Sequence, residues 1–388
     1  MSLWFDTPAK RTPLSGFICD GNINIDKDNF ATLLQLYSRK EFEDFLITEI
    51  LDKSIKFPYT PLTVHDAIYS FNYLKSYNCR GLLDGKVFTK FDYEFEISNK
   101  YLDEPLLGNN CSNFFQQENR MMCAHAKFPS PIEAWKDRKQ LHHLVGGIFT
   151  LKYDYLNMSN LRTLIAMRLY IASQFRPTVA KAIYDMFNSV DVLDFSSGWG
   201  DRLAGFYAAK TTKTYIGIDP NDKVYNQYYK QAELYSALTT PKKCVFINKP
   251  AEEVSLESEI VDTVFTSPPY FNTEKYSVDA TQSYIRYTND DMWLTKFMYP
   301  TLNMCWKALK PNGYLIINIS DVKTGNKVHK ICDAMNYYIK NELQGVYETG
   351  FGMKLSTRPN SLASNVSKDE ILCEPVWVWK KPATQFNI

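Results

Sequence analysis

The chain has 388 residues, of which 45% are hydrophobic and 22% are charged, and its formal net charge is +1. This composition is ordinary for a globular protein of one or two domains, and no run of about 18 apolar residues predicts a transmembrane helix. The eight cysteines form no disulfide framework, and Met-Ser-Leu-Trp-Phe-Asp at the start lacks the features of a secretory signal. We therefore expect a cytoplasmic protein that is neither secreted nor bound to a membrane.

The first 150 residues predict a mostly helical α+β extension. In chain order we expect an irregular arm over 1–28, helices over 29–55 and 61–77, short strands within 80–108 and a further helical stretch over 131–149. Cys111, Cys123 and His125 match no common zinc spacing, so we expect no metal site.

Residues 151–388 predict an α/β domain in which strands alternate with helices. The expected helices are 161–175, 178–187, 201–209, 290–309 and 327–342, and the expected strands are 191–195, 214–218, 244–248, 262–266, 313–319, 345–353 and 375–380. This alternation is typical of a Rossmann-like sheet covered by helices on both faces.

Ligand-type residues follow the first two strands of this domain. Asp194 ends a short apolar strand, and Ser196, Gly198 and Gly200 form a loop whose glycines allow a tight turn and close approach to a ligand. The loop lacks the G-x-G-x-x-G fingerprint, which argues against NAD and favours a nucleoside such as S-adenosylmethionine. About 20 residues later, Asp219-Pro220 ends the next strand, where an acid can bind both ribose hydroxyls.

A second loop, Ser267-Pro268-Pro269-Tyr270, follows the strand over 262–266. Two prolines fix the backbone and remove two N–H donors, which leaves carbonyls free to accept hydrogen bonds. Ser267 Oγ and the Pro268 carbonyl are therefore candidates to accept hydrogen bonds from an amino group, and Tyr270 offers a face on which a base can stack. Taken alone, the tetrapeptide equally fits a proline-rich turn.

In this order and spacing, the two loops resemble the cofactor loop and the catalytic loop of DNA amino-methyltransferases, over about residues 160–381. The resemblance implies a seven-stranded class I methyltransferase sheet, S-adenosylmethionine as cofactor, and transfer of its methyl group to the exocyclic nitrogen of a flipped-out base. It places Glu252 beside the adenine ring and Arg176 at the methionine end, although a solvated arginine at a helix junction is equally compatible with Arg176. No metal or covalent intermediate is implied. The segments Gly198-Trp199-Gly200-Asp201-Arg202 and Glu374-Pro375-Val376-Trp377-Val378-Trp379 are most similar to methyltransferases of large phages and viruses, which would place the protein inside a host cell.

The first residue of the catalytic loop bears on the target base. In the family, Ser267 favours cytosine N4 over adenine N6, and both remain open. Cytosine-C5 transfer is excluded, because it requires a cysteine after a proline and none of the eight cysteines has one. Transfer to RNA or to a protein glutamine is the alternative activity, and a non-catalytic recognition subunit is a third reading.

Little sequence remains after the catalytic loop for target recognition. We therefore expect two domains, 1–150 and 151–388, with the first recognising the target or a partner subunit. DNA is the expected partner, and a homodimer remains open. Residues after the catalytic loop, Asn272, Glu274 and Tyr276, are expected to shape the base pocket. The loop Arg358–Ser361 is placed to reach DNA.

Overall fold

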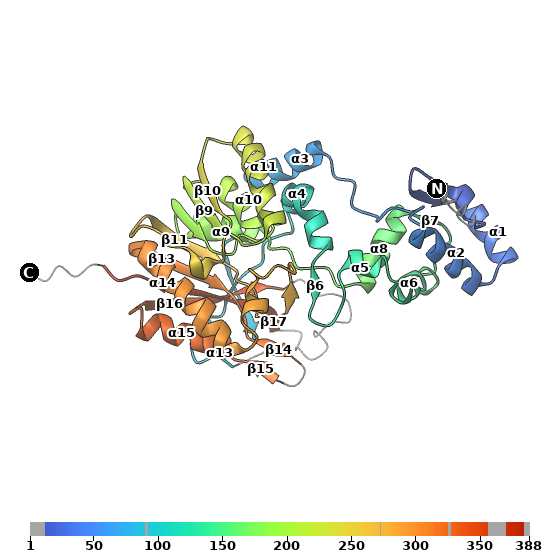
Figure 1. The fold of residues 1–388 in the computed structure, drawn as a ribbon. Helices are drawn as coiled ribbons and strands as arrows, with labels where there is room; N and C mark the ends of the chain where they lie inside the picture. Colours follow the sequence, from blue (N-terminus) through green and yellow to red (C-terminus); the bar gives the residue numbers. More distant parts are fainter. Residues whose placement is uncertain (1–11, 90–91, 272, 325–326, 356–369, 384–388) are drawn as a thin grey trace, which may run out of the picture. The chain divides into compact units, whose positions relative to one another are not determined.

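The computed structural model describes residues 12–89, 92–271, 273–324, 327–355 and 370–383. Two compact units are present: a smaller unit formed by residues 1–61 and 120–172, and a larger unit formed by residues 62–119 and 173–388 (Figure 1). The expected boundary after residue 150 therefore differs from the division between these units. Asn272 and the segment Arg358–Ser361 lie outside the described residues.

The smaller unit is mainly helical, with a small sheet of order β1-β2-β7. Its helices α2, α6 and α8 pack around a core that includes Phe42, Leu46, Leu141 and Leu164, all fully buried. The elements of this unit are a 3-10 helix Ser15–Phe17, β1 (Ile18–Cys19), β2 (Asn22–Ile25), α1 (Lys27–Leu36), α2 (Arg39–Leu51), β6 (Ala124–His125), α5 (Pro131–Ala134), α6 (Arg138–Val145), α7 (Gly147–Thr150), β7 (Leu156–Asn157) and α8 (Met158–Arg168).

The larger unit is built on one mixed sheet. In chain order its elements are α3 (Val64–Ser76), β3 (Leu82–Asp84), β4 (Lys86–Phe88), β5 (Lys100–Leu102), α4 (Asn109–Met121, which runs into the smaller unit), α9 (Pro177–Met186), β8 (Asp191–Asp194), α10 (Asp201–Ala208), β9 (Thr214–Ile218), α11 (Asp222–Leu238), β10 (Lys243–Ile247), a 3-10 helix Ala251–Glu253, β11 (Val261–Thr266), β12 (Glu274–Lys275), α12 (Ser283–Arg286), α13 (Asp290–Trp293), a π-helical turn Leu294–Met298, α14 (Tyr299–Ala308), β13 (Leu309–Asn318), β14 (Val322–Thr324), β15 (Lys327–His329), α15 (Ile331–Asn341), β16 (Val346–Lys354) and β17 (Glu370–Lys380).

Seven strands of this sheet have the order β10-β9-β8-β11-β13-β17-β16. The first five run parallel, and β17 is antiparallel to both of its neighbours. This is the expected Rossmann-like, seven-stranded class I methyltransferase sheet. The chain leaves β8 toward one edge and returns to β11 on the other side of it, so the topological switch point lies between the carboxyl ends of β8 and β11, where ligands bind in such sheets.

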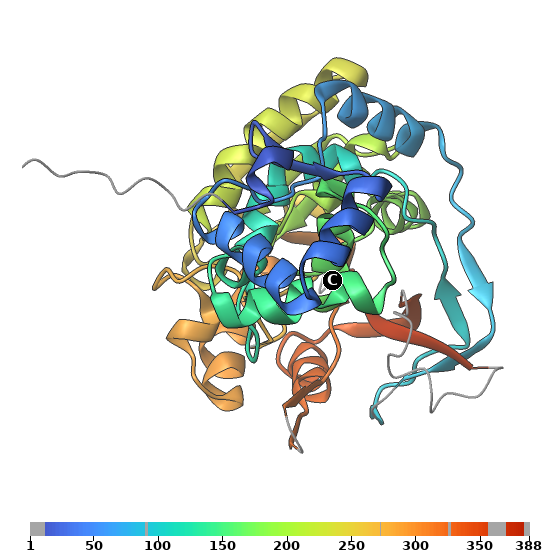
Figure 2. The same ribbon diagram turned by 90° about the vertical axis from the view of Figure 1, so that its right-hand side faces the viewer.

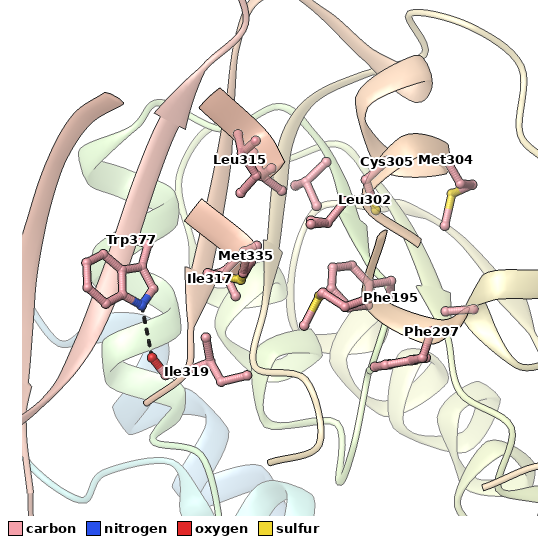
Figure 3. Packing of buried hydrophobic residues seen from close by; sticks show 14 of the residues in the cluster. Phe195, Phe297, Leu302, Met304, Cys305, Leu315, Ile317, Ile319, Met335 and Trp377 are labelled. Carbon is pink, nitrogen blue, oxygen red and sulfur yellow. Dashed lines mark hydrogen bonds between the residues drawn. The ribbon is translucent and has the colours of Figure 1, made fainter. Parts of the chain in front are cut away.

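Helices cover both faces of the sheet because side chains alternate along each strand. On β11, Val264 belongs to the core formed with α14 and α15, whereas the next residue, Phe265, packs edge-on against Tyr184 of α9. Figure 3 shows the first of these two cores, in which the Trp377 indole also donates to the Ile319 carbonyl at 3.0 Å.

Residues 62–119 pack with the sheet, which is why the units divide elsewhere than at residue 150. β5 pairs in parallel with β16, and β3 pairs with β5 (light blue and cyan in Figure 2), so these short strands extend the sheet beyond its seven strands. The Lys181 ammonium of α9 donates to the carbonyls of Leu74, Lys75 and Tyr77 at the end of α3.

Several expected elements differ from the structure in their extent. The arm over 1–28 contains the hairpin of β1 and β2. The expected helix 161–175 ends at Arg168, since the backbone of Ser173 bonds instead to Glu274 and Trp199. The expected helix 290–309 is interrupted by the π-helical turn that precedes Pro300, which has no N–H to donate.

Within the described residues, no helix has the length and apolar character needed to cross a membrane. The same part of the chain holds no group of three or more metal-ligating side chains.

Candidate active site at the sheet switch point

The glycine loop connects β8 to α10. Both glycines adopt left-handed backbone angles, with φ of 58° at Gly198 and 77° at Gly200. A Cβ at Gly200 would overlap the side-chain amide of Gln231, whereas a Cβ at Gly198 would meet only ordinary contacts. Gly200 is therefore required by packing against α11, and Gly198 leaves the partly exposed side of the loop open to a ligand.

The Asp194 carboxylate lies at the centre of this loop and is fully buried. Arg202 of α10 pairs with it through Nε at 2.8 Å and Nη2 at 3.2 Å. The Tyr215 and Thr266 hydroxyls donate at 2.7 and 2.8 Å, and the Ser196 amide donates at 3.3 Å. A carboxylate can accept about four hydrogen bonds, so these donors occupy all the acceptor positions of Asp194. Asp194 thus ties together β8, β9, β11 and α10.

Asp219 at the end of β9 is placed differently, because its carboxylate is only partly buried. It accepts hydrogen bonds from the amides of Asn221 and Gly198, each at 3.0 Å, and interacts with the Tyr228 hydroxyl. Burial raises the pKa of Asp219 to about 6, against the effect of these hydrogen bonds. Acceptor capacity remains for a ligand hydroxyl. The following residue, Pro220, accepts at its carbonyl from Thr281 at 3.4 Å.

Glu252 follows β10, and its carboxylate is already engaged. Oε1 accepts from Arg286 at 2.7 Å and from the Tyr287 hydroxyl at 2.8 Å. Burial raises the pKa of Glu252, opposed by these two partners. Glu252 therefore fixes the segment that carries α12.

Arg176 is buried, so it is not a solvated arginine. None of its described hydrogen bonds reaches the glycine loop. The guanidinium donates to the carbonyls of Glu104, at 2.9 Å, and Lys354. It thereby joins the ends of β5 and β16. Burial lowers the pKa of Arg176, and the nearby charges of Asp103 and Glu374 oppose this effect.

The Ser-Pro-Pro-Tyr loop begins directly beside the glycine loop. Thr266, the last residue of β11, donates to Asp194, the last residue of β8, so Ser267 starts next to the carboxyl end of β8. Pro268 is buried, and Ser267, Pro269 and Tyr270 are partly exposed.

The residue after this tetrapeptide, Phe271, has a φ of 48° although it has a bulky side chain. Strain of this kind persists where the surrounding structure imposes it, often at functional sites. The turn is fixed by the Thr273 amide, which donates to the Tyr270 carbonyl at 3.0 Å.

Around this loop, Glu374 was not assigned to the site from the sequence, whereas Glu274 and Tyr276 were expected to shape a base pocket. The Tyr270 hydroxyl donates to Glu374 Oε2 at 3.3 Å, on β17. Glu274 accepts from the amide and hydroxyl of Ser173 at 3.0 and 3.3 Å and from the Tyr276 hydroxyl. In the sequence, the position of a glutamate next to the apolar segment Val376-Trp377 was a sign of a partly buried acid.

The Ser-Pro-Pro-Tyr loop lies in a segment of the chain that matches a known family by sequence. Residues 261–387 match a family model described as DNA methylase. The matched segment includes Ser267–Tyr270 and Glu374, while the glycine loop lies outside it. A search among curated proteins finds no match to the chain.

Similar solved structures have low identity to this chain. A methyltransferase of Methanosarcina mazei is 13% identical, with 52% of this chain and 97% of that chain covered and a TM-score of 0.34. A methyltransferase of Pyrococcus furiosus is 12% identical, with 54% and 84% covered and a TM-score of 0.36. Magnesium protoporphyrin IX methyltransferase of Synechocystis PCC 6803 is 10% identical, with 53% and 79% covered and a TM-score of 0.35.

The matched family indicates a methyltransferase that uses S-adenosylmethionine. The residues at the switch point fit this cofactor. Asp219 retains acceptor capacity for ribose hydroxyls, and the backbone at Gly198 is open to a ligand. Asp194 and Glu252 are engaged by protein donors and are suited to holding the loops that surround the cofactor.

Proposed function

We propose that this protein is a DNA amino-methyltransferase that modifies cytosine N4 or adenine N6. The observation that carries the proposal is the hydrogen bond from Thr266 to Asp194, which brings the Ser-Pro-Pro-Tyr loop next to the glycine loop at the switch point. The match of residues 261–387 to DNA methylases supports the substrate class. Ser267 at the first position of the loop favours cytosine N4.

The chemistry of this reaction requires acceptors for amino N–H groups. The lone pair of an exocyclic amino nitrogen is delocalised into the base, and hydrogen bonds from its N–H groups to Ser267 Oγ and the Pro268 carbonyl allow the nitrogen to pyramidalise. Tyr270 stacks on the base, and such stacking contributes about 1–3 kcal/mol. The base reaches this position by leaving the duplex.

S-adenosylmethionine supplies an electrophilic methyl group when it is bound. We assign the ribose hydroxyls to Asp219, and we place the methionine portion against the open side of the backbone at Gly198, where a Cβ would meet only ordinary contacts. Asp194 and Glu252 act as positioning residues. We also propose that the smaller unit contributes to target recognition, because its lysines and arginines outnumber its aspartates and glutamates by 15 to 12.

A methyl-transfer assay tests this function. The protein is incubated with S-adenosylmethionine carrying a labelled methyl group and with unmethylated genomic DNA or total RNA, and the labelled nucleosides are identified by mass. We expect N4-methylcytosine or N6-methyladenine from DNA. Label only in RNA, or only in protein, would overturn the DNA assignment.

Two serine variants make the assay specific for the proposed loop. We expect Ser267→Ala to reduce transfer by about 10²-fold or more, as loss of a key hydrogen-bonding group does at other sites, with unchanged affinity for S-adenosylhomocysteine. Ser255→Ala removes an exposed hydroxyl just before β11 and should behave as wild type. Equal activity of both variants would mean that another group binds the amino nitrogen.

A further inference from the structure

Tyr270 connects the catalytic loop to a carboxyl group on β17. Its hydroxyl lies 3.3 Å from Glu374 Oε2 and 3.5 Å from the Asn318 carbonyl. Burial raises the pKa of Tyr270, and hydrogen bonding by the Ser267 side chain in the same loop counteracts this rise. Glu374 and Ser267 therefore sit at the two ends of a short hydrogen-bond chain whose middle member is Tyr270.

The chemistry of these groups determines which of them donates each hydrogen bond. A carboxylate and a backbone carbonyl only accept hydrogen bonds, so the single proton of the Tyr270 hydroxyl points toward Glu374 and Asn318. The Tyr270 oxygen is then left as an acceptor for the Ser267 hydroxyl. With its own proton donated to Tyr270, Ser267 Oγ presents lone pairs, and this is the state needed to accept an N–H of the target amino group.

The charge of Glu374 decides whether the Tyr270 hydroxyl proton points toward its carboxyl group. The carboxyl is only partly exposed, and burial raises its pKa to about 7. The Tyr270 hydrogen bond and the Arg176 guanidinium favour the ionised form, whereas Glu274 disfavours it. Beyond these groups, Lys354 is paired with Asp103 at 2.7 Å. Protonated Glu374 is itself a donor, so it no longer fixes the direction of the Tyr270 proton.

We propose that Glu374 is the positioning residue at the end of the chain Ser267–Tyr270–Glu374, which makes Ser267 an acceptor for the target amino group and carries away the proton that this group loses. This inference rests on the proposed function. The N–H bond of the methylated amino group breaks and its proton binds Ser267 Oγ. The proton of Ser267 moves to Tyr270, and that of Tyr270 binds Glu374, which releases it to water.

The first test compares single-turnover transfer rates across neutral pH. The wild-type rate should rise with pH around the pKa of Glu374, about 7. Glu374→Gln keeps the shape but cannot ionise, so its rate should fall by about 10²-fold, a typical contribution of proton transfer, and its pH dependence should disappear. Tyr270→Phe keeps the ring but breaks the chain. It should show the same loss, and the double variant should lose nothing further.

The control is Glu348→Gln, which neutralises an exposed carboxyl on the adjacent strand β16 and should leave the rate and its pH profile unchanged. Retention of the wild-type rate by Glu374→Gln would overturn the proposal. So would a slower Glu374→Gln enzyme that kept the wild-type pH profile, because a merely structural role predicts that result.

The second test needs no turnover. Ionisation of Glu374 should perturb the ultraviolet absorption of Tyr270, giving a step near the same pH in wild type that is absent from Glu374→Gln and from Tyr270→Phe. If this step is present and no methyl transfer is found, the proposed function is refuted, whereas the link between Glu374 and Tyr270 is supported. If transfer occurs and neither the step nor the kinetic coupling is seen, the proposed hydrogen-bond chain Ser267–Tyr270–Glu374 is refuted and the proposed function is retained.

Discussion

Asp219 is the residue whose ionisation should govern cofactor affinity. A carboxylate accepts hydrogen bonds from ribose hydroxyls, and protonation removes part of this capacity. Since the pKa of Asp219 is raised from 3.8 to about 6, affinity should be full above this value and fall as pH decreases through about 6. The effect of pH on folding stability is opposite. Because the folded state binds this proton more tightly than the unfolded state, Asp219 lowers the free energy of unfolding as pH rises from 3.8 to about 6.

Calorimetric titration with S-adenosylhomocysteine checks the prediction for affinity. Wild type should show a midpoint near pH 6, and Asp219→Asn should bind more weakly at neutral pH without this midpoint. A variant that kept wild-type affinity at neutral pH would remove Asp219 from the cofactor site.

Substitution of Arg202 tests how much the buried hydrogen-bond network around Asp194 contributes to stability. The pair has side-chain exposures of 5% and 0%, so removing one partner leaves a charge without compensation. Arg202→Met should lower the free energy of unfolding by about 3–5 kcal/mol, as breaking buried ion pairs does, measured by denaturant unfolding. The double variant Asp194→Asn with Arg202→Met should recover part of this loss. Lys27→Ala breaks an exposed pair with Asp154 and should cause no measurable change.

At the scale of elements, the turn from β8 into α10 depends on Gly200. Alanine there must adopt a left-handed backbone, which costs about 1–2 kcal/mol, and its methyl group must displace Gln231. We expect Gly200→Ala to lower both stability and affinity for S-adenosylhomocysteine. Gly16→Ala is the matched control, since a Cβ there meets nothing within 4 Å. Unchanged cofactor affinity in Gly200→Ala would show that the loop tolerates rearrangement.

Strands were predicted well where the sequence signal is local. The apolar run before Asp194 predicts β8 within one residue, and the run before Ser267 does the same for β11. Helix ends were harder to predict when they depend on partners distant in sequence. The backbone of Ser173 leaves the expected helix because Glu274 and Trp199 bind it, and periodicity contains no information about such contacts.

The same distinction applies to the candidate site. Ser267 and Tyr270 were recognisable because they share one short motif with unusual prolines. Glu374 lies more than a hundred residues away in sequence and reaches Tyr270 only because β17 inserts between β13 and β16. Arg176 was expected at the cofactor, and its guanidinium donates to the carbonyls of Glu104, shortly after β5, and of Lys354, the last residue of β16.

At the scale of the whole molecule, the sequence could not reveal how the chain divides. Residues 62–119 look like a continuation of the N-terminal extension, yet β5 pairs with β16, about 250 positions later. The smaller unit is consequently discontinuous. It holds 15 lysines and arginines against 12 aspartates and glutamates, a net +3, whereas the larger unit holds 29 against 31, a net −2.

This charge difference makes the smaller unit the better candidate for contact with DNA phosphates. Lys136, Arg138 and Lys139 are exposed at the start of α6. Replacing all three by glutamine should weaken DNA binding and reduce the slope of log affinity against log salt by up to about 0.9 for each lost phosphate contact. Fluorescence anisotropy at several salt concentrations measures both quantities.

The matched control removes the same charge from the larger unit. Lys213, Lys243 and Lys307 are exposed near the amino ends of β9, β10 and β13, at the opposite edge of the sheet from the switch point. Their replacement by glutamine should leave the salt slope unchanged, because phosphates approaching the catalytic loop do not reach that edge. If both triple variants reduced the slope equally, net charge alone would account for binding, and recognition would have to be assigned to another surface.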